Sequence, residues 1–489
     1  MKGSKSRRVQ AGSRTAGGAD TTASARGWID ALRPRWPRLV GISILVLSLV
    51  GALGHFLGGV AGFWEFSHSA AIGRLAGSGA MSNAARGDVA APLLSIAILP
   101  FSTPSDSTAD RRLADALTQD VTIAIAGWRW ASVAAYGVAS GYKDGPADAR
   151  SAGRALNVRY VLAAEARDSG HGLVVNASLI DVGTGSQVWT DRLEFAASRA
   201  ADQPPVPHLL LAKRLRSGLM AVEQRRVTAA PLNDSPMEAT LRGMAVQSNA
   251  ADRLQGIRAA SEAYVQVLRR SPNFTPAMWR YVAVLSDELF ENPTADRDHI
   301  AAEMDMSSSR AIKIDALDSE AWRARASTLE VLGRWNEALA ASDRARALFP
   351  ASVGNVLEQA YVLTYSGRPE QALPVAQLAL AMDPQEASSL HFVCKILVYL
   401  GRYADAVAAC EKAAAMENGW ANQFYLTAAY ANTGELAKAT IARDELLRQQ
   451  PGFTIQRYRQ IFHSSPPAFF DLVDRHIAPA MRRVGLADR

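Results

Sequence analysis

From Leu93 onward, short apolar runs alternate with segments whose apolar residues recur at helical spacing. Ser95–Phe101 is an apolar run that ends beside a proline, which predicts a buried strand. A cluster of Ser, Thr and Asp follows, and then four apolar residues at four-residue steps. This arrangement predicts an N-capped amphipathic helix with Leu113, Leu117, Val121 and Ile125 on its buried face.

The same reasoning extends the pattern to residue 230. It predicts strands at 131–136, 158–167, 173–181 and 187–195, and helices at 148–156 and 207–226. Tight-turn sequences at Asp168–Gly172 and Val182–Gly185 join the last three strands. Residues 93–230 are therefore expected to form an α+β domain with a mixed sheet.

A second pattern repeats about every 34 residues between Ser319 and Phe453. Glycines recur at intervals of 34, 34 and 33 residues, at Gly333, Gly367, Gly401 and Gly434. Five residues after each glycine comes an alanine, and further small residues follow at Ala345, Ala379 and Ala413. Prolines close three of the units, at Pro350, Pro384 and Pro451. This period predicts two antiparallel helices per unit, with the glycine in the turn between them and the proline ending the second helix.

The pattern resembles the tetratricopeptide repeat family. The unit from Ser319 to Ser352 carries most of the family's features, at Trp322, Gly333, Trp335, Ala338, Ala345 and Pro350. The resemblance implies an all-α solenoid of stacked hairpins with a concave surface. With degenerate units at 236–272 and 275–316, about six units are expected over residues 231–455, and capping helices over 456–489. The alternative, a run of Ala-rich amphipathic helices, does not explain four units in register.

The predicted α+β domain has a resemblance of its own. The segments SIAILPF, LADALTQD, SAGRALNVRYVLAAEARDSG and LIDVGTGSQVW are similar to the TolB-like amino-terminal domain. In bacteria this domain accompanies tetratricopeptide repeats in membrane-anchored adenylate/guanylate cyclases and winged-helix regulators. Here the loop after Phe101 lacks the usual Asn, and the short segment before the apolar span leaves no room for a cyclase or winged helix. The chain is thus expected to contain the sensory domains of these proteins without a cyclase or winged-helix output domain.

The N-terminal region predicts a membrane anchor. Residues 1–38 are rich in Arg, Ser, Gly and Ala, which indicates a disordered basic tail. Residues 39–64 carry no formal charge and would span about 39 Å as a helix, enough for a hydrocarbon core of about 30 Å. A signal peptide cut near Ser69 is the alternative, but its N-terminal region would be unusually long. Residues 65–92 are Ala/Gly/Ser-rich and read as a flexible linker.

The charge on either side of the predicted span sets its orientation. Nine basic residues precede it, whereas residues 65–92 hold two Arg against one Glu and one Asp. The positive-inside rule then puts the N-terminus in the cytoplasm and the bulk of the chain in the periplasm, as a single-pass inner-membrane protein. Gly54, Gly58 and Gly62 share one helix face, which suits a homodimer in the membrane, although glycine is common in membrane helices.

Net charge and cysteine content narrow the function classes. Of the net +6, residues 1–38 carry +7, which leaves 6 − 7 = −1 for the rest, so no basic folded surface for nucleic acid is indicated. Cys394 and Cys410 lie on the two helices of one repeat. They are interpreted as small buried apolar residues, with a disulfide as the alternative in an oxidising compartment. Their spacing is not that of a metal site.

Motifs for catalysis are missing from the sequence. There is no GxSxG, no HExxH and no P-loop lysine. Gly183-Thr184-Gly185 begins like a dinucleotide fingerprint, but a strand follows it, so a hairpin turn is the better interpretation. His391 has no ligand-spaced partner and is interpreted as a lone surface histidine. No enzymatic activity, metal or cofactor is expected.

Repeat-family positions imply a peptide groove on the first helices of the units. The residues placed there are Arg323, Ser327, Glu330, Leu357, Tyr361, Thr364, Tyr365, His391, Lys395, Val398, Tyr399, Phe424 and Asn432. Aromatic side chains together with one Lys and one Arg suit an extended or helical peptide. The alternative is that Tyr361, Tyr365 and Tyr399 fill gaps between repeats as core residues.

These observations predict a membrane-anchored periplasmic protein that binds a polypeptide partner as a scaffold or sensor. One alternative is an adenylate cyclase-like signalling protein without its catalytic domain. Another is an envelope regulator that acts through the basic tail, on anionic lipid or a cytoplasmic partner.

Overall fold

The computed structural model describes residues 94–104, 107–142, 148–169, 172–196, 207–229, 235–292 and 294–489. The predicted basic tail, membrane span and linker, and with them Gly54, Gly58 and Gly62, lie outside these residues. Among the helices that the described residues form, none combines the length and the apolar character that crossing a membrane requires.

The first part of the described chain forms a mixed sheet with strand order β2-β1-β3-β4-β5. β1 (Ser95–Ile98) pairs in parallel with β2 (Ser132–Val133) and with β3 (Tyr160–Asp168). β3, β4 (Gly172–Asp181) and β5 (Gln187–Ala196) form the predicted antiparallel meander. The strand predicted at 131–136 is only two residues long, because the chain turns into α5 (Tyr136–Ala139) and the 3₁₀ turn η1 (Ser140–Tyr142).

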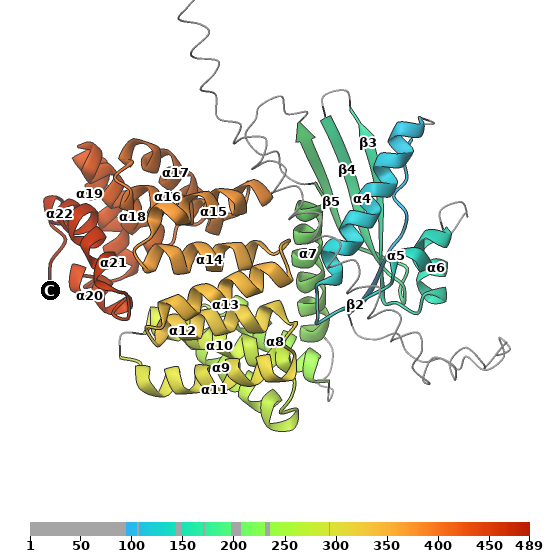
Figure 1. Ribbon diagram of the computed structural model, residues 1–489, viewed down its shortest axis with the longest axis horizontal. Helices are drawn as coiled ribbons and strands as arrows, with labels where there is room; N and C mark the ends of the chain where they lie inside the picture. The colour runs from blue at the N-terminus through green and yellow to red at the C-terminus, as the bar shows by residue number, and fades with distance from the viewer. Residues whose placement is uncertain are drawn as a thin grey trace, which may run out of the picture. The chain divides into compact units, whose positions relative to one another are not determined.

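Helices cover both faces of this sheet (Figure 1). α4 (Thr108–Ala126) and α7 (Pro207–Ala229) pack together on one face, where Leu117, Val121 and Ile125 join Leu215 and Leu219 in one core. Leu113, expected on the same face of α4, is 38% exposed instead. α6 (Ala149–Ala155) covers the other face. α7 lies close to β5 because residue 218 is glycine: a Cβ there would come within 2.5 Å of the Trp189 indole.

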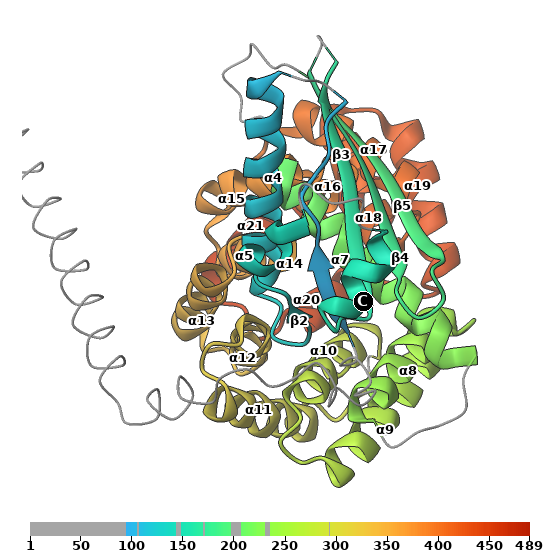
Figure 2. The same ribbon diagram turned by 90° about the vertical axis from the view of Figure 1, so that its right-hand side faces the viewer.

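The described residues between 235 and 453 form helical hairpins that are stacked one after another (Figures 1 and 2). In chain order the pairs are α8 (Pro236–Asn249) with α9 (Arg253–Arg270), α10 (Thr275–Glu291) with α11 (Arg297–Ile314), α12 (Ser319–Val331) with α13 (Trp335–Leu348), α14 (Val353–Tyr365) with α15 (Pro369–Met382), α16 (Ala387–Tyr399) with α17 (Tyr403–Met416), and α18 (Trp420–Thr433) with α19 (Leu436–Gln449).

The residues that define the repeat do what their period predicts. The four turn glycines have φ between +70° and +86°, a left-handed conformation that closes the first helix of each unit. The seven alanines at the repeated offsets are fully buried, because helices approach closely at those points: Ala338, Ala345, Ala372, Ala379, Ala406, Ala413 and Ala439.

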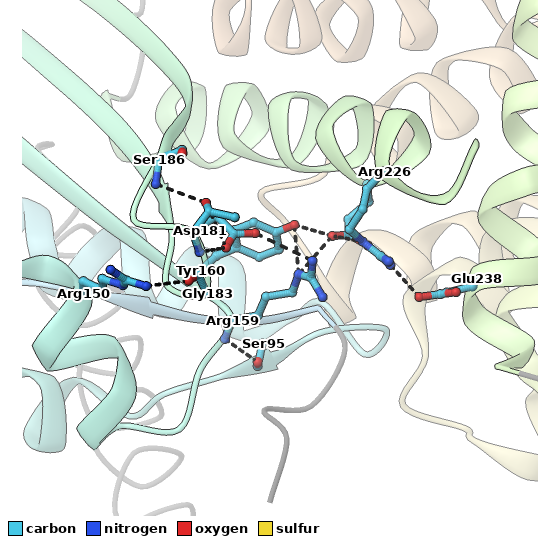
Figure 3. Close-up of polar contacts among 11 residues, drawn as sticks. Ser95, Arg150, Arg159, Tyr160, Asp181, Gly183, Ser186, Arg226 and Glu238 are labelled. Atoms are coloured by element: carbon cyan, nitrogen blue, oxygen red, sulfur yellow. Dashed lines mark hydrogen bonds and ion pairs between the residues drawn. The ribbon is translucent and has the colours of Figure 1, made fainter. Parts of the chain in front are cut away.

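A buried polar network joins the sheet to the first repeat (Figure 3). Glu223 of α7 is fully buried and accepts a hydrogen bond from the Tyr160 hydroxyl of β3. Arg226 bridges Glu223, at 2.8 Å, and Glu238 of α8, at 2.7 Å. Burial, with the neighbouring Glu223 charge, raises the pKa of Tyr160, so its hydroxyl stays a donor to the carboxylate. The network therefore fixes α7 against both domains.

Further ion pairs connect α7 to later repeats. Lys213 contacts Asp383 and Glu386 at the start of α16, and Arg216 contacts Glu320 on α12 at 2.8 Å. Asp383 is fully buried, so its pairing with Lys213 and Arg214 compensates a charge that would otherwise be costly. α7 thus packs on the sheet and is also ion-paired to the edge of the repeat array.

The C-terminal segment after α19 runs back along the repeats rather than only covering the last one. It consists of α20 (Ile455–Ile461), α21 (Pro467–Leu472), the π-helical turn η2 (Val473–Ile477) and α22 (Ala478–Arg483). Its backbone accepts hydrogen bonds from the third unit, where Trp335 donates to the Ser464 carbonyl at 2.7 Å, and from the sixth, where Asn432 donates to the His476 carbonyl at 2.8 Å.

The aromatic side chains of the C-terminal segment pack against the repeat array. Tyr458, Phe462 and Phe469 lie buried among the first helices of the later units, and Phe462 stacks on Tyr365 with ring centroids 4.2 Å apart. The segment packs on the last unit through α22 and α18, as a cap would, and it also fills part of the inner surface. Its aromatic residues recur at helical spacing, so burying them against the open face of the array removes a large apolar area from water.

A disulfide joins the two helices of the fifth unit. Cys394 and Cys410 are fully buried and bonded, with Cα atoms 4.9 Å apart. They are buried as predicted, and the disulfide that the sequence left open is formed. The same close approach that small residues permit in each unit brings the two Cβ atoms within bonding range.

If the C-terminal segment is part of the core, its two adjacent phenylalanines should differ sharply. Phe469→Ala should lower the free energy of unfolding by about 3–5 kcal/mol, because it leaves a cavity among Tyr365, Tyr399 and Phe462. Phe470→Ala is the matched control, since Phe470 is only partly buried. Denaturant titration of both variants measures the difference, and equal losses would contradict the assignment.

Candidate binding cleft on the repeat array

The first helices of the units line the inner surface of the array. Contacts run in series from α10 to α12, α14, α16 and α18. Because side chains three and four residues apart share one helix face, each of these helices presents one row of side chains to this surface. The sequence-predicted groove residues belong to these rows, but the C-terminal segment divides them into a covered set and an open set.

The covered set lies under α20 and α21. Tyr365, Lys395, Tyr399 and Phe424 are each no more than 2% exposed, and Thr364 and Val398 are fully buried. For Tyr365 and Tyr399 the alternative interpretation, a place in the core, is the one the structure has. These residues are closed to a partner because Tyr458, Phe462 and Phe469 occupy the space in front of them.

Four tyrosine hydroxyls meet in this covered region. Tyr425 lies 2.7 Å from Tyr458 and 3.3 Å from both Tyr365 and Tyr399, measured between hydroxyl oxygens. Burial raises the pKa of all four well above the ordinary value, so each hydroxyl keeps its proton and can donate within the cluster. Hydrogen bonds within the cluster give partners to tyrosine hydroxyls that would otherwise be buried among aromatic rings without one.

Lys395 lies beside this cluster and is enclosed by rings. Its Nζ donates to the Tyr365 hydroxyl at 3.2 Å and lies 3.4 Å from the ring centroid of Phe392. Burial lowers its pKa well below the ordinary value, while the charge of Glu330 opposes that shift. Lys395 is thus a core cation held by aromatic faces rather than a side chain that reaches out for a peptide.

Two further residues predicted in the groove make internal contacts. His391 is not a lone surface histidine: its Nδ1 lies 2.6 Å from Asn422 Oδ1, and burial lowers its pKa to about 3. Asn432 is held by the C-terminal segment, through the His476 carbonyl and Arg483. Both positions are used by internal contacts that a single repeat does not reveal.

The open set lies on α12 and α14, between α7 on one side and the C-terminal segment on the other. A cavity of about 270 Å³ on the segment's side is lined by Arg323, Ser327, Glu330 and Tyr361. A cavity of about 350 Å³ on the side of α7 is lined by Arg323 and Leu357. Arg323 lines both cavities, and we call the two cavities with these five predicted residues the inner cleft.

A carboxyl pair lies in the inner cleft. Glu330 is 8% exposed, and the partly buried Glu358 accepts a hydrogen bond from Ser327 at 2.6 Å. Burial raises the pKa of both carboxyls, and the charge of Glu358 raises that of Glu330 further. Oε1 of Glu330 has no hydrogen-bond partner among the described residues. The sequence analysis missed Glu358, which is the neighbour of a predicted groove residue, Leu357.

At the α7 side of the cleft, Glu320 holds two guanidinium groups. Arg216 and Arg323 each approach it to 2.8 Å. Burial alone would raise the pKa of Glu320, but Arg323 and Arg216 hold it below the ordinary value. The positive charge of Arg323 is thereby committed to this pair. Arg216 also escaped the sequence analysis, because its role depends on a contact between domains.

Among the described residues, no group of three or more His, Cys, Asp or Glu side chains is arranged to hold a metal ion.

No protein-family profile matches the chain. "Putative adenylate cyclase 3" of Rhizobium meliloti (strain 1021) is 33% identical over 100 residues, which is 20% of this chain and 17% of that protein. The match thus spans about a sixth of the length of that relative.

Solved structures with similar helices share little sequence with this chain. YrrB, described as a TPR protein with an unusual peptide-binding site, is 16% identical with a TM-score of 0.27, over 42% of this chain and 98% of YrrB. PilW, a type IV pilus biogenesis factor, is 16% identical with a TM-score of 0.36, over 48% of this chain and 99% of PilW. Likenesses at this level extend no function to this chain.

The raised pKa of Glu330 has a consequence for stability. The folded protein keeps the Glu330 proton at a pH where the unfolded chain has lost it. The contribution of this protonation to the free energy of unfolding is therefore fully present below about pH 4.3, and it is lost as the pH rises toward the folded pKa. Glu330→Gln removes the ionisation. The variant should gain free energy of unfolding relative to the wild type as the pH is raised from about 4.5 to 8, measured by denaturant titration at each pH. A difference that does not change with pH would contradict the raised pKa.

Proposed function

We propose that the chain is an interaction scaffold that binds a polypeptide segment in the inner cleft. The observation that carries this proposal is the open lining of the two cavities by Arg323, Ser327, Glu330, Leu357 and Tyr361. It combines apolar and aromatic surface with charged groups and is bounded by two walls, as a bound segment requires. The scaffold role needs no catalytic group.

The proposed setting is the periplasmic side of an inner membrane. The apolar residues 39–64 and the basic flank before them support an anchor with a cytoplasmic N-terminus. The Cys394–Cys410 disulfide supports an oxidising compartment, since disulfides persist there and are rare in the cytosol. A TolB-like character of the sheet domain remains part of this proposal, as does a homodimer through the glycine face of the span.

A second candidate, a cyclase-like signalling protein, is favoured by the 33% identity with "Putative adenylate cyclase 3". In this interpretation the chain would take part in signalling through its sheet and repeats. That identity covers only 20% of this chain and 17% of the relative, so the scaffold proposal, which rests on the lining of the cleft, is preferred.

Photo-crosslinking tests the position of the partner. A crosslinking amino acid in place of Leu357 in the cleft should capture a polypeptide in cells, because Leu357 is only partly buried and lines the larger cavity. Ile441 on α19 is the matched control, since it is 70% exposed on a second helix away from the cleft. A product that forms equally from both positions, or from Ile441 alone, would contradict binding in the cleft. Mass spectrometry identifies the product.

Thiol labelling tests the compartment. Cells are denatured in an alkylating reagent without reductant, and both cysteines should stay unlabelled until a reductant is added, because the disulfide is already formed in the cell. A cytosolic protein with an unpaired cysteine, labelled in the same sample, shows that the reagent was active. Immediate labelling of Cys394 or Cys410 would argue against an oxidising compartment.

A further inference from the structure

The smaller cavity of the inner cleft carries an excess of acidic groups. Three carboxyls line it, on Asp287, Glu330 and Glu358, against two guanidinium groups, on Arg297 and Arg323. Arg323 donates from both Nε and Nη2 to Glu320, which does not line this cavity. Because Arg323 is paired with Glu320, it neutralises the three carboxyls of the cavity less than its place in the lining suggests.

One of these carboxyls has an unused acceptor. Oε1 of Glu330 is buried and receives no hydrogen bond from another residue of the described chain, while the Glu330 carboxyl is hydrogen-bonded to that of Glu358. Buried polar atoms in folded proteins nearly always have a partner. An acceptor of this kind that lines a cavity is available to a donor from outside the chain.

Aromatic side chains surround the carboxyl pair. Phe290, Trp335, Tyr361 and Phe462 line the same cavity. The Trp335 indole nitrogen already donates to the Ser464 carbonyl, so its ring remains as an apolar wall. Ring faces attract cations, most strongly where water is excluded.

In the adjoining cavity, a lysine of the chain itself lies among aromatic rings. This cavity measures about 190 Å³, shares Phe290, Tyr361 and Phe462 with the first, and contains the Lys395 ammonium among its rings. Lys395 Nζ lies near the rings of Phe392, Tyr361 and Tyr365, and the charge of Glu330 opposes the lowering of its pKa. A basic side chain placed in the first cavity would find the same kinds of group, aromatic rings and the Glu330 carboxyl.

We propose that this cavity takes one basic side chain, Lys or Arg, from the bound polypeptide, with Glu330 and Glu358 as acceptors and the aromatic residues as its walls. The proposal rests on the function proposed above and specifies its partner. A volume of about 270 Å³ lies just below the range of roughly 300–1,000 Å³ typical of small-molecule sites, which suits a single side chain.

Peptide selection on the full chain tests this proposal. Random peptides displayed on phage are selected on the wild type, on Glu330→Gln and on Glu370→Gln, a control on the exposed face of α15. Wild type and control should enrich peptides with Lys or Arg at one position, and Glu330→Gln should not. In synthetic versions, norleucine for Lys or citrulline for Arg should weaken wild-type binding roughly tenfold or more.

The outcomes separate this inference from the proposed function. Peptides that block crosslinking at Leu357 but show no basic preference, or tolerate norleucine or citrulline, would overturn the inference and leave the cleft as a peptide site. If no selected peptide blocks that crosslinking, both proposals are overturned. Thermal unfolding checks the fold of Glu330→Gln. If Glu330→Gln does not fold, Glu358→Gln replaces it, because Glu358 is only partly buried. A folded variant that selects the same peptides as the wild type would also overturn the inference.

Discussion

The arrangement of the cleft depends on the burial of a few aromatic side chains by the C-terminal segment. A stack of helical hairpins leaves the inner faces of its first helices uncovered, and in the later units these faces are strongly apolar. Tyr458, Phe462 and Phe469 cover them, and their rings pack with those of Tyr365, Tyr399 and Phe424. The hydrophobic effect thus decides which part of the inner surface is core and which part remains open.

Polar groups at the centre of the covered region bond to one another, whereas one carboxyl oxygen of the open region receives no hydrogen bond. The tyrosine hydroxyls bond to one another, and Lys395 lies among rings with a hydroxyl as its acceptor. Glu330 of α12 keeps an acceptor without a donor among the described residues. Since unsatisfied buried groups destabilise a fold, their concentration in a cavity is more typical of a binding site than of a core.

Much of the fold could be predicted from local patterns, because turns and helix faces are set by nearby residues. The turn glycines, the buried alanines and the antiparallel meander follow from spacing alone. The division of the groove could not be predicted, because an aromatic row such as Tyr458 and Phe462 can cap an end or fill a surface equally well. The disulfide likewise depends on how closely two helices approach, and residue spacing leaves both states of Cys394 and Cys410 open.

Helix α7 makes the apparent boundary between sheet and repeats misleading. Its apolar side closes the sheet core, while its charged side supplies the counter-ions for Glu238, Glu320 and Asp383. Cutting the chain between residues 229 and 235 would separate two regions that look like independent modules. The repeats would then keep buried Glu238 and Asp383 without the cations of α7, and the wall of the larger cavity would be gone. The two regions are modules of sequence but a single electrostatic unit.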